Sequence, residues 1–369
     1  MRHDPAQIAQ MLAAKFRRSA AMAAERGIIP YKSENGQWEE SPYDGNGWWT
    51  SGFWPGLMWI LWKQTGEGQF LQEAKRTCEL LAQELRTFRY LHHDVGFMYL
   101  LSTGGDWKLT GNEQAHQDTL HAASLMMARF NPEGFIRAWN GKDQMGYAIV
   151  DCMMHLSILF WASRETGDPR FAKVAKIHAD TTLREFLRED GSLSHIIEFD
   201  PETGKRVKEY GGQGYELGSA WSRGQAWGLY GFTLAYMNTG EERYLVAAKK
   251  IATFFTAHIR EDGLTDCDFC QPKEPERLDN IAGACAACGL LELAKATGEA
   301  QWQEAAEKLL DGLMDHCCDW TENSCGVLTH CTASYHSDDA GFHTNITYGD
   351  YFFAEAIAKL CGNDPMLWL

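Results

Sequence analysis

Two kinds of helical pattern alternate along the chain. Segments of the first kind are apolar or small on nearly every side, which is typical of buried helices; they cover 52–64, 95–101, 146–164, 223–237, 281–296 and 351–360. Segments of the second kind are amphipathic, with Lys, Arg and Glu on one face; they cover 6–26, 69–86, 113–129, 170–188, 242–260 and 300–316. Six buried helices alternating with six amphipathic ones predict an inner ring inside an outer ring. We therefore predict an all-α fold, an (α/α)6 barrel that forms a single domain over residues 1–369.

A short motif recurs at the junctions between the two kinds of helix. Thr and Gly are followed by an acidic residue or Asn at Thr65-Gly66-Glu67, Thr110-Gly111-Asn112, Thr166-Gly167-Asp168, Thr239-Gly240-Glu241 and Thr297-Gly298-Glu299. Glycine after a helix caps its carboxyl end, and an acidic residue next to it favours the start of another helix. The motif therefore predicts five tight turns, each joining an inner helix to the outer helix that follows.

The connections in the opposite direction are mostly long. They are rich in Gly, Pro, Trp, Asp and His and cover 27–51, 130–145, 189–221, 261–280 and 317–348, whereas the link at 87–94 is short. Because all inner helices run parallel, these loops gather at one end of the barrel, where the inner helices also begin. Function concentrates on loops over a rigid scaffold, and converging helix N-termini favour an anionic group on a ligand.

Charge and composition limit the kinds of partner and the compartment that we expect for this protein. The net charge of −16 argues against a nucleic acid or an anionic membrane as partner, because both need a basic face. No apolar run reaches the length of a membrane span, and residues 1–18 carry charges where a signal sequence would be apolar. Eleven cysteines, an odd number, favour reduced thiols in the cytoplasm over a disulfide framework.

Four of these cysteines have a spacing close to that of a structural zinc site. Cys267, Cys270, Cys285 and Cys288 form C-x2-C-x14-C-x2-C. The second pair, however, lies in a predicted inner helix among Gly and Ala, where Cys serves as one more small apolar residue. We therefore predict no metal and keep zinc as the alternative.

Two aspartates stand out at the loop end of the inner helices. Asp94 begins the second inner helix, and Asp151 lies near the start of the third, in an apolar surrounding. A buried carboxylate needs a partner or a function. Asp94 alternatively caps its helix, and Asp151 alternatively pairs with an arginine. Two carboxylates on adjacent inner helices would flank one cavity, the arrangement that acid/base chemistry on glycosides requires.

Other candidate residues belong to the same end of the predicted barrel. Aromatic faces stack on sugar rings, although most tryptophans in any protein are core residues; the tryptophans at this end include Trp49, Trp139, Trp221 and Trp227. His195 and Gln213 lie in the longest loop, where either could be an ordinary loop residue. Arg223 begins the fourth inner helix and is either salt-bridged in the core or directed at the cavity.

Four motifs, in order along most of the chain, resemble the unsaturated glucuronyl hydrolases of glycoside hydrolase family 88. They are His93-Asp94-x-Gly-Phe97, Asp151-x-Met-Met154, Trp221-Ser-Arg-Gly-Gln-Ala-Trp227-Gly-x-Tyr-Gly and Tyr348-Gly-Asp-Tyr-Phe-Phe-x-Glu355-Ala. The family fold is an (α/α)6 barrel, in agreement with the helix pattern. The segment around Gln213 follows the family only loosely.

The resemblance implies an enzyme that removes a 4,5-unsaturated uronic acid from the non-reducing end of oligosaccharides left by polysaccharide lyases, of the glycosaminoglycan or gellan and xanthan type. It implies Asp151 as general acid/base and Asp94 as the second essential carboxylate. Substrate-binding residues would be His93, His195, Gln213 and Arg223, with Trp49, Trp139, Trp221 and Trp227 as stacking walls. No metal or organic cofactor is expected, because protonation of an electron-rich alkene needs only an acid.

Two alternatives remain. The related unsaturated rhamnogalacturonyl hydrolases, which act on pectin fragments, share the fold but favour Arg-Gly-Asn-Gly-Trp where this chain has Arg223-Gly-Gln-Ala-Trp227. A barrel that binds carbohydrate without turning it over is the non-enzymatic alternative.

Overall fold

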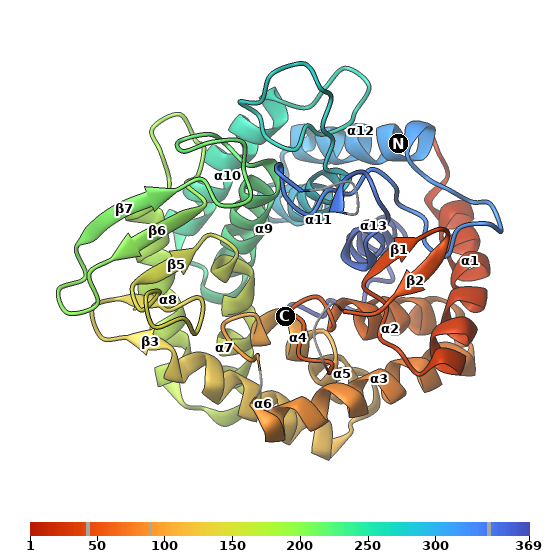
Figure 1. Cartoon of the computed structure of the whole chain (residues 1–369), viewed down its shortest axis with the longest axis horizontal. Coiled ribbons are helices and arrows are strands. Elements are labelled where there is room, and N and C mark those ends of the chain that lie inside the picture. The colour runs from red at the N-terminus through yellow and green to blue at the C-terminus, as the bar shows by residue number, and fades with distance from the viewer. Residues whose placement is uncertain (42–44, 89, 338–340) are drawn as a thin grey trace.

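The computed structural model, which describes residues 1–41, 45–88, 90–337 and 341–369, has two concentric rings of helices (Figure 1). The inner ring contains α2 (Phe53–Thr65), α4 (Val95–Leu100) with α5 (Thr103–Thr110), α7 (Cys152–Thr166), α9 (Ser222–Thr239), α11 (Asn280–Thr297) and α13 (Thr347–Leu360). The outer ring contains α1 (Pro5–Arg26), α3 (Gly68–Thr87), α6 (Glu113–Ala128), α8 (Pro169–Glu185), α10 (Glu242–Ala257) and α12 (Ala300–His316). The ring closes where α13 packs beside α1, so the predicted (α/α)6 barrel is confirmed.

All five Thr-Gly turns form as predicted. Their glycines end an inner helix in the left-handed conformation, with φ from 68° to 72°. The threonine has a part of its own, because the Oγ1 atom of Thr65 accepts a hydrogen bond from the backbone N–H of Glu67 at 3.1 Å. The same bond recurs at the turns after α7, α9 and α11. Four of the five turns are therefore fixed by a contact within three residues.

Two inner helices differ from the prediction. The second is longer than 95–101, because the chain resumes helical structure as α5 after an irregular backbone at Ser102. Gly105 lets α5 approach α2, since a Cβ atom there would lie 2.7 Å from the Trp59 ring. The third begins at Cys152 rather than at 146, because residues 147–149 form a strand instead.

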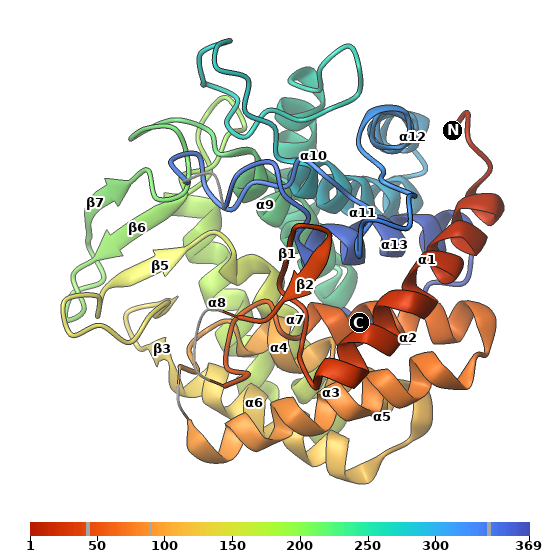
Figure 2. The same ribbon diagram turned by 45° about the vertical axis from the view of Figure 1, so that its right-hand side comes forward.

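Short strands, which the helical pattern did not predict, lie on the loop end of the barrel (Figure 2). Two hairpins are formed by β1 (Lys32–Glu34) with β2 (Gln37–Glu39) and by β3 (Phe130–Asn131) with β4 (Phe135–Ile136). A three-stranded antiparallel sheet is formed by β5 (Tyr147–Ile149), β6 (Ile196–Phe199) and β7 (Arg206–Tyr210), in that order. One face of this sheet buries Ala148, Ile197 and Phe199 in the main core.

The opposite end of the barrel is filled by the last residues of the chain. The Trp368 ring stacks on Phe352 at 6.3 Å, and its Nε1 donates to Glu355 at 2.9 Å. Lys359, also buried, pairs with Glu292 at 2.8 Å and with Asp364 at 2.6 Å. The C-terminus therefore lies near the barrel axis (Figure 1), and the loop end is the one that carries the candidate site.

The cysteines do not gather into a zinc site. None of the eleven forms a disulfide. Cys285 and Cys288 lie buried on α11, whereas Cys270 is exposed on a loop. Within the described ranges, no three of the four candidate thiols lie close enough to share an ion. Among those same residues, no helix is long and apolar enough to cross a membrane.

A buried aspartate on α13 is expected to make the stability of the barrel depend on pH. The Asp350 carboxyl is fully buried and accepts hydrogen bonds from the backbone N–H groups of Val327 and Leu328. Burial raises its pKa to about 7, although these N–H groups lower it. Oδ2 of Asp350 has no hydrogen-bond partner among the described residues. Oδ1 of Asn345, which like Oδ2 of Asp350 lies next to Gly326, also has no hydrogen-bond partner among them.

We expect Asp350→Asn to stabilise the protein at pH 8. The folded state keeps a proton on Asp350 up to about pH 7, whereas the unfolded chain releases it near pH 4, so this residue weakens the fold as pH rises between the two values. Three pKa units correspond to up to about 4 kcal/mol. Thermal unfolding at pH 5 and pH 8 tests this: a gain that is equal at both values would contradict it.

Candidate active site

The two predicted carboxylates lie at the heads of neighbouring inner helices. Asp94 directly precedes α4 and Asp151 directly precedes α7, and these helices pack side by side. Both side chains are buried, with 7% and 6% of their surface exposed. Neither makes a hydrogen bond that caps its helix. Their carboxylates are therefore available for other contacts.

Three imidazoles surround Asp94. Nδ1 of His92 lies 2.9 Å from its Oδ2, and Nε2 of His155, on the first turn of α7, lies 3.0 Å from its Oδ1. Nε2 of His93 lies 3.6 Å from the same oxygen. Burial by itself would raise the pKa of Asp94, but the histidines outweigh it and hold that pKa well below its usual range. Asp94 is therefore a carboxylate at neutral pH.

The same cluster has a donor set that suits a metal. Nitrogen atoms of His92 and His93 and an oxygen of Asp94 lie within 4.8 Å of one another. His93 is fully buried, and burial holds its pKa well below the usual range. Among the described residues this is the one group of three side chains with metal-ligand geometry. The sequence analysis predicted no metal.

Asp151 has a different surrounding. Its Oδ2 lies 3.6 Å from Nε2 of His195 and has no hydrogen-bond partner among the described residues. The arginine partner considered as an alternative is not there, since His195 is the one ion-pair contact that the described part of the chain gives this carboxyl. The position is set by the sheet: the N–H of Val150 donates to the carbonyl of His195 at 3.0 Å.

The loop residues His195 and Gln213 contact each other. Nδ1 of His195 accepts a hydrogen bond from the backbone N–H of Gln213 at 3.1 Å. Its ring lies 4.3 Å from that of Trp221, which fixes the imidazole between the β7 loop and the head of α9. The Gln213 side chain donates to the carbonyl of Ala333 at 2.8 Å and so ties this loop to the one before α13.

Arg223 is fully buried beside these residues. Its guanidinium pairs with Asp279, the residue before α11, and donates to the carbonyls of Thr332 at 2.7 Å and Ala333 at 2.6 Å. Burial alone would lower the pKa of Arg223, but Asp279 keeps it raised. Burial also raises the pKa of Asp279, and we take the pair as charged because a guanidinium keeps its proton at ordinary pH.

Comparison with known proteins identifies the family. The family model described as Glycosyl Hydrolase Family 88 matches residues 15–348. The unsaturated glucuronyl hydrolase of Bacillus sp. (strain GL1) is 37% identical over 325 residues, which are 85% of this chain and 86% of that protein. The chain belongs to glycosyl hydrolase family 88. It is accordingly a glycosidase.

Solved structures agree with this family 88 assignment. The crystal structure of the unsaturated glucuronyl hydrolase from Bacillus sp. GL1, described as responsible for the degradation of glycosaminoglycan, has a TM-score of 0.91 and 32% identity over 98% of both chains. A structure of a UGL variant with dGlcA-Glc-Rha-Glc has a TM-score of 0.90 and 32% identity, and the match covers 97% of this chain and 98% of that one.

The four tryptophans of this family 88 enzyme divide into two groups. Trp49 is half-buried, with its ring 5.0 Å from Tyr348, and Trp139 is half-buried on the loop before β5. Trp221 is 2% exposed. Trp227 is fully buried, 5.2 Å from Phe97 and 5.5 Å from Phe352, and its role as a stacking wall stays a prediction.

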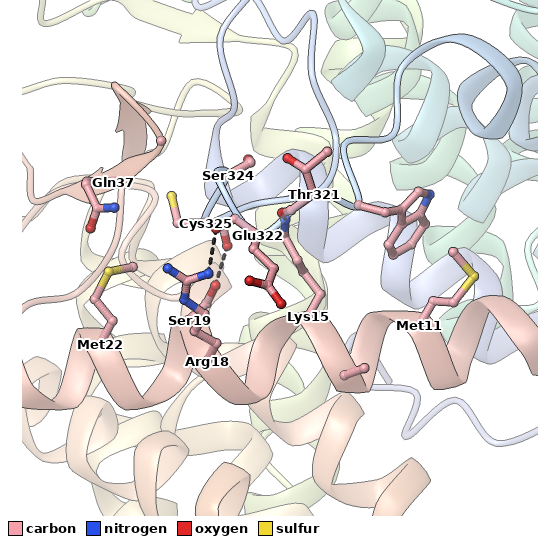
Figure 3. Close-up of a pocket in the computed structure, with 13 residues that line it drawn as sticks. Met11, Lys15, Arg18, Ser19, Met22, Gln37, Thr321, Glu322, Ser324 and Cys325 are labelled. Atoms are coloured by element: carbon pink, nitrogen blue, oxygen red, sulfur yellow. Dashed lines mark hydrogen bonds between the residues drawn. The ribbon is translucent and has the colours of Figure 1, made fainter.

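A separate cavity lies far from these carboxylates in the family 88 barrel. It has a volume of about 380 Å³ and lies between α1 and residues 320–325, with Lys15, Arg18 and Trp320 among its lining residues (Figure 3). The cations there donate to the carbonyls of Thr321 and Glu322. It contains none of the family motif residues, so we place the active site at the carboxylates instead.

Sequence reasoning missed four residues of the site, and one of them, His92, lies two positions before Asp94. His155 lies four residues after Asp151, so it faces the same side of α7, but nothing local shows that it reaches Asp94. Asp279 and Tyr348 were also not selected, although Tyr348 opens a family motif. Their partners, Arg223 and Trp49, lie far away in the sequence.

Proposed function

We propose that this enzyme removes a 4,5-unsaturated uronic acid from the non-reducing end of oligosaccharides, with Asp151 as general acid/base. The observation that carries the proposal is the contrast between the two carboxyl groups. Asp94 is held ionised by histidines, whereas Asp151 leaves Oδ2 without a hydrogen-bond partner among the described residues, beside His195. A general acid/base must be able to exchange its proton with the substrate.

The C4=C5 bond of the substrate is an enol ether, which an acid activates without breaking the glycosidic bond directly. The Asp151 carboxyl transfers its proton to C4, and positive charge develops at C5 and the ring oxygen. Water adds to C5 and returns a proton to the Asp151 carboxylate, which restores the acid. The C5 hemiketal opens to a ketone, and the C1 hemiacetal that results expels the remaining sugar as an alcohol. One water molecule is consumed for each glycosidic bond broken.

The other predicted residues have complementary roles in this proposal. Asp94 holds hydroxyl groups of the unsaturated sugar, and His93, His195, Gln213 and Arg223 provide its polar surroundings. Trp49, half-buried beside Tyr348, offers a ring for stacking. The N-termini of the inner helices meet at this end and favour the substrate carboxylate.

The substrate class follows from the relatives. They include a glycosaminoglycan-degrading enzyme and a structure with a glucuronyl tetrasaccharide. We propose lyase products of glycosaminoglycans as the first substrates to test. We also propose action in the cytoplasm, on the odd number of cysteines.

The test uses the ultraviolet absorbance of the C4=C5 bond conjugated to the uronate carboxylate. Enzyme added to lyase-digested chondroitin, hyaluronan, heparin or gellan is expected to abolish this absorbance in at least one digest. Mass spectrometry is expected to find the shortened sugar and a keto-aldehyde acid that has the same mass as the free unsaturated uronic acid, so that the two products together exceed the substrate by one water. If folded protein leaves all four digests unchanged, the proposal is wrong.

A further inference from the structure

A row of aromatic rings lies on the solvent side of the β5–β6–β7 sheet. Trp139 and Tyr147 have ring centroids 6.1 Å apart, and those of Tyr147 and Tyr210 are 5.1 Å apart. All three side chains are half-buried and pack over a small apolar cluster of Ala138, Ile149 and Ile196, separate from the main core. We call these three rings the aromatic row.

The row is continuous with the active site. Tyr147 begins the strand that leads to Asp151, and Tyr210 pairs in register with Ile196, the residue after His195. The carbonyl of Gly211, next to Tyr210, lies 3.3 Å from Nδ1 of His195. The row therefore starts beside the catalytic carboxyl and leads away from it across the sheet.

The row is held rigidly at both ends. The Arg129 guanidinium donates to the carbonyls of Arg137, Ala138 and Trp139, each at 2.8 to 2.9 Å, and so fixes the Trp139 loop. At the other end, the Tyr210 hydroxyl donates to Glu198 at 2.5 Å. That hydrogen bond, with a second to Tyr147, raises the pKa of Tyr210. Preformed rings of this kind bind at a low cost in conformational entropy.

The polar groups around the row suit a charged sugar chain. Lys208 is exposed, with its Nζ 4.6 Å from the centre of the Tyr210 ring, and it has no ion-pair partner among the described residues. Glu198, opposite Lys208 in the sheet, is half-buried. Aromatic faces with polar groups at their edges stack on sugars and bind their hydroxyl groups, and an ammonium group adds attraction for a uronate or a sulfate.

We propose that the aromatic row binds the sugar residues of longer substrates that lie beyond the one attached to the unsaturated uronic acid. The inference rests on the proposed function and adds a preference for chain length. The occupant is the leaving-group part of the same oligosaccharide, from its second sugar onward. Tyr147 and Tyr210 provide the rings on which these sugars stack, and Lys208 attracts an acidic sugar beside them.

The experiment compares two substrates with the same unsaturated end, the disaccharide and the tetrasaccharide from lyase-digested hyaluronan. The readout is the ratio of kcat/KM for the tetrasaccharide to kcat/KM for the disaccharide. Tyr210→Ala and Tyr147→Ala are each expected to lower this ratio about three- to tenfold, mostly through KM, because a ring that stacks only on the longer chain is lost. Lys208→Gln is expected to lower it more at low than at high ionic strength.

Controls separate stacking from general damage. Tyr210→Phe keeps the ring but loses the hydrogen bond to Glu198, so it is expected to lower the ratio less than Tyr210→Ala does. Val207→Ala changes an exposed neighbour on β7 outside the row. A loss that is equal for both substrates, or no change in the ratio in either alanine variant, would overturn the row as a binding surface. If the hyaluronan disaccharide is not hydrolysed, the same two chain lengths are taken from whichever of the four digests the unmodified enzyme does hydrolyse, and failure on all four would instead overturn the proposed function itself.

Discussion

Replacing Asp151 by Asn is expected to lower kcat on unsaturated uronyl disaccharides by on the order of 10³-fold, the contribution of a general acid/base. The amide has nearly the shape of the carboxyl but cannot give a proton to C4. The substitution is also expected to be neutral for folding, because Oδ2 of Asp151 has no hydrogen-bond partner in the described part of the chain. Decay of ultraviolet absorbance and thermal unfolding measure the two effects.

The matched control is Asp143→Asn, an exposed aspartate in the loop before β5. It removes the same charge from the same end of the barrel and is expected to leave kcat unchanged. KM of the Asp151 variant should change little, because the group acts on the transition state. If Asp151→Asn kept more than about a tenth of the native kcat, another group would have to supply the proton.

The paired helices were predictable because their signals are local. Each Thr-Gly turn is fixed by a glycine with positive φ and, at four of the five, by a hydrogen bond from the N–H two residues later to the threonine hydroxyl. Three consecutive residues therefore encode both the glycine conformation and the threonine hydrogen bond. The alternation of buried and amphipathic helices then determines which ring each helix joins.

Structure that depends on distant contacts was not predictable. The segment Thr103–Thr110 contains Gly104 and Gly105, which disfavour helix, yet it is helical because the missing side chain makes room for Trp59. Residues 147–149 fit a helix or a strand as a short apolar run. They form a strand because they pair with β6, which lies far along the chain. As a result α7 begins at Cys152, and Asp151 directly precedes the helix instead of lying inside it.

In the candidate site, too, local features were predictable and contacts between distant residues were not. The sequence locates Asp94 as a carboxylate where an inner helix begins, and Asp151 as a carboxylate in an apolar surrounding near the start of the next. It does not reveal that His155 holds Asp94, because that contact crosses from α7 to α4. Its motif selects Trp227 as a predicted sugar contact, but does not reveal that the ring lies against Phe97 and Phe352, because those residues come from other helices.

The variant Arg223→Met is expected to lose about 3–5 kcal/mol of stability together with most of the activity. The substitution leaves the Asp279 carboxylate buried without its cation, which is the costly way to break a buried ion pair. It also releases the carbonyls of Thr332 and Ala333, which Arg223 holds beside Gln213. Denaturant unfolding and kcat/KM on the disaccharide measure the two losses.

A second substitution separates the role of Arg223 in folding from its predicted contact with substrate. Asp279→Asn removes the stranded charge, and its Oδ1 can still accept the N–H of Ile281 that caps α11. The double variant is therefore expected to recover most of the stability lost in Arg223→Met. Its kcat/KM is expected to stay low, because the guanidinium is still missing from the site. Recovery of activity in step with stability would show that Arg223 acts only through its ion pair, and the predicted contact with substrate would be wrong.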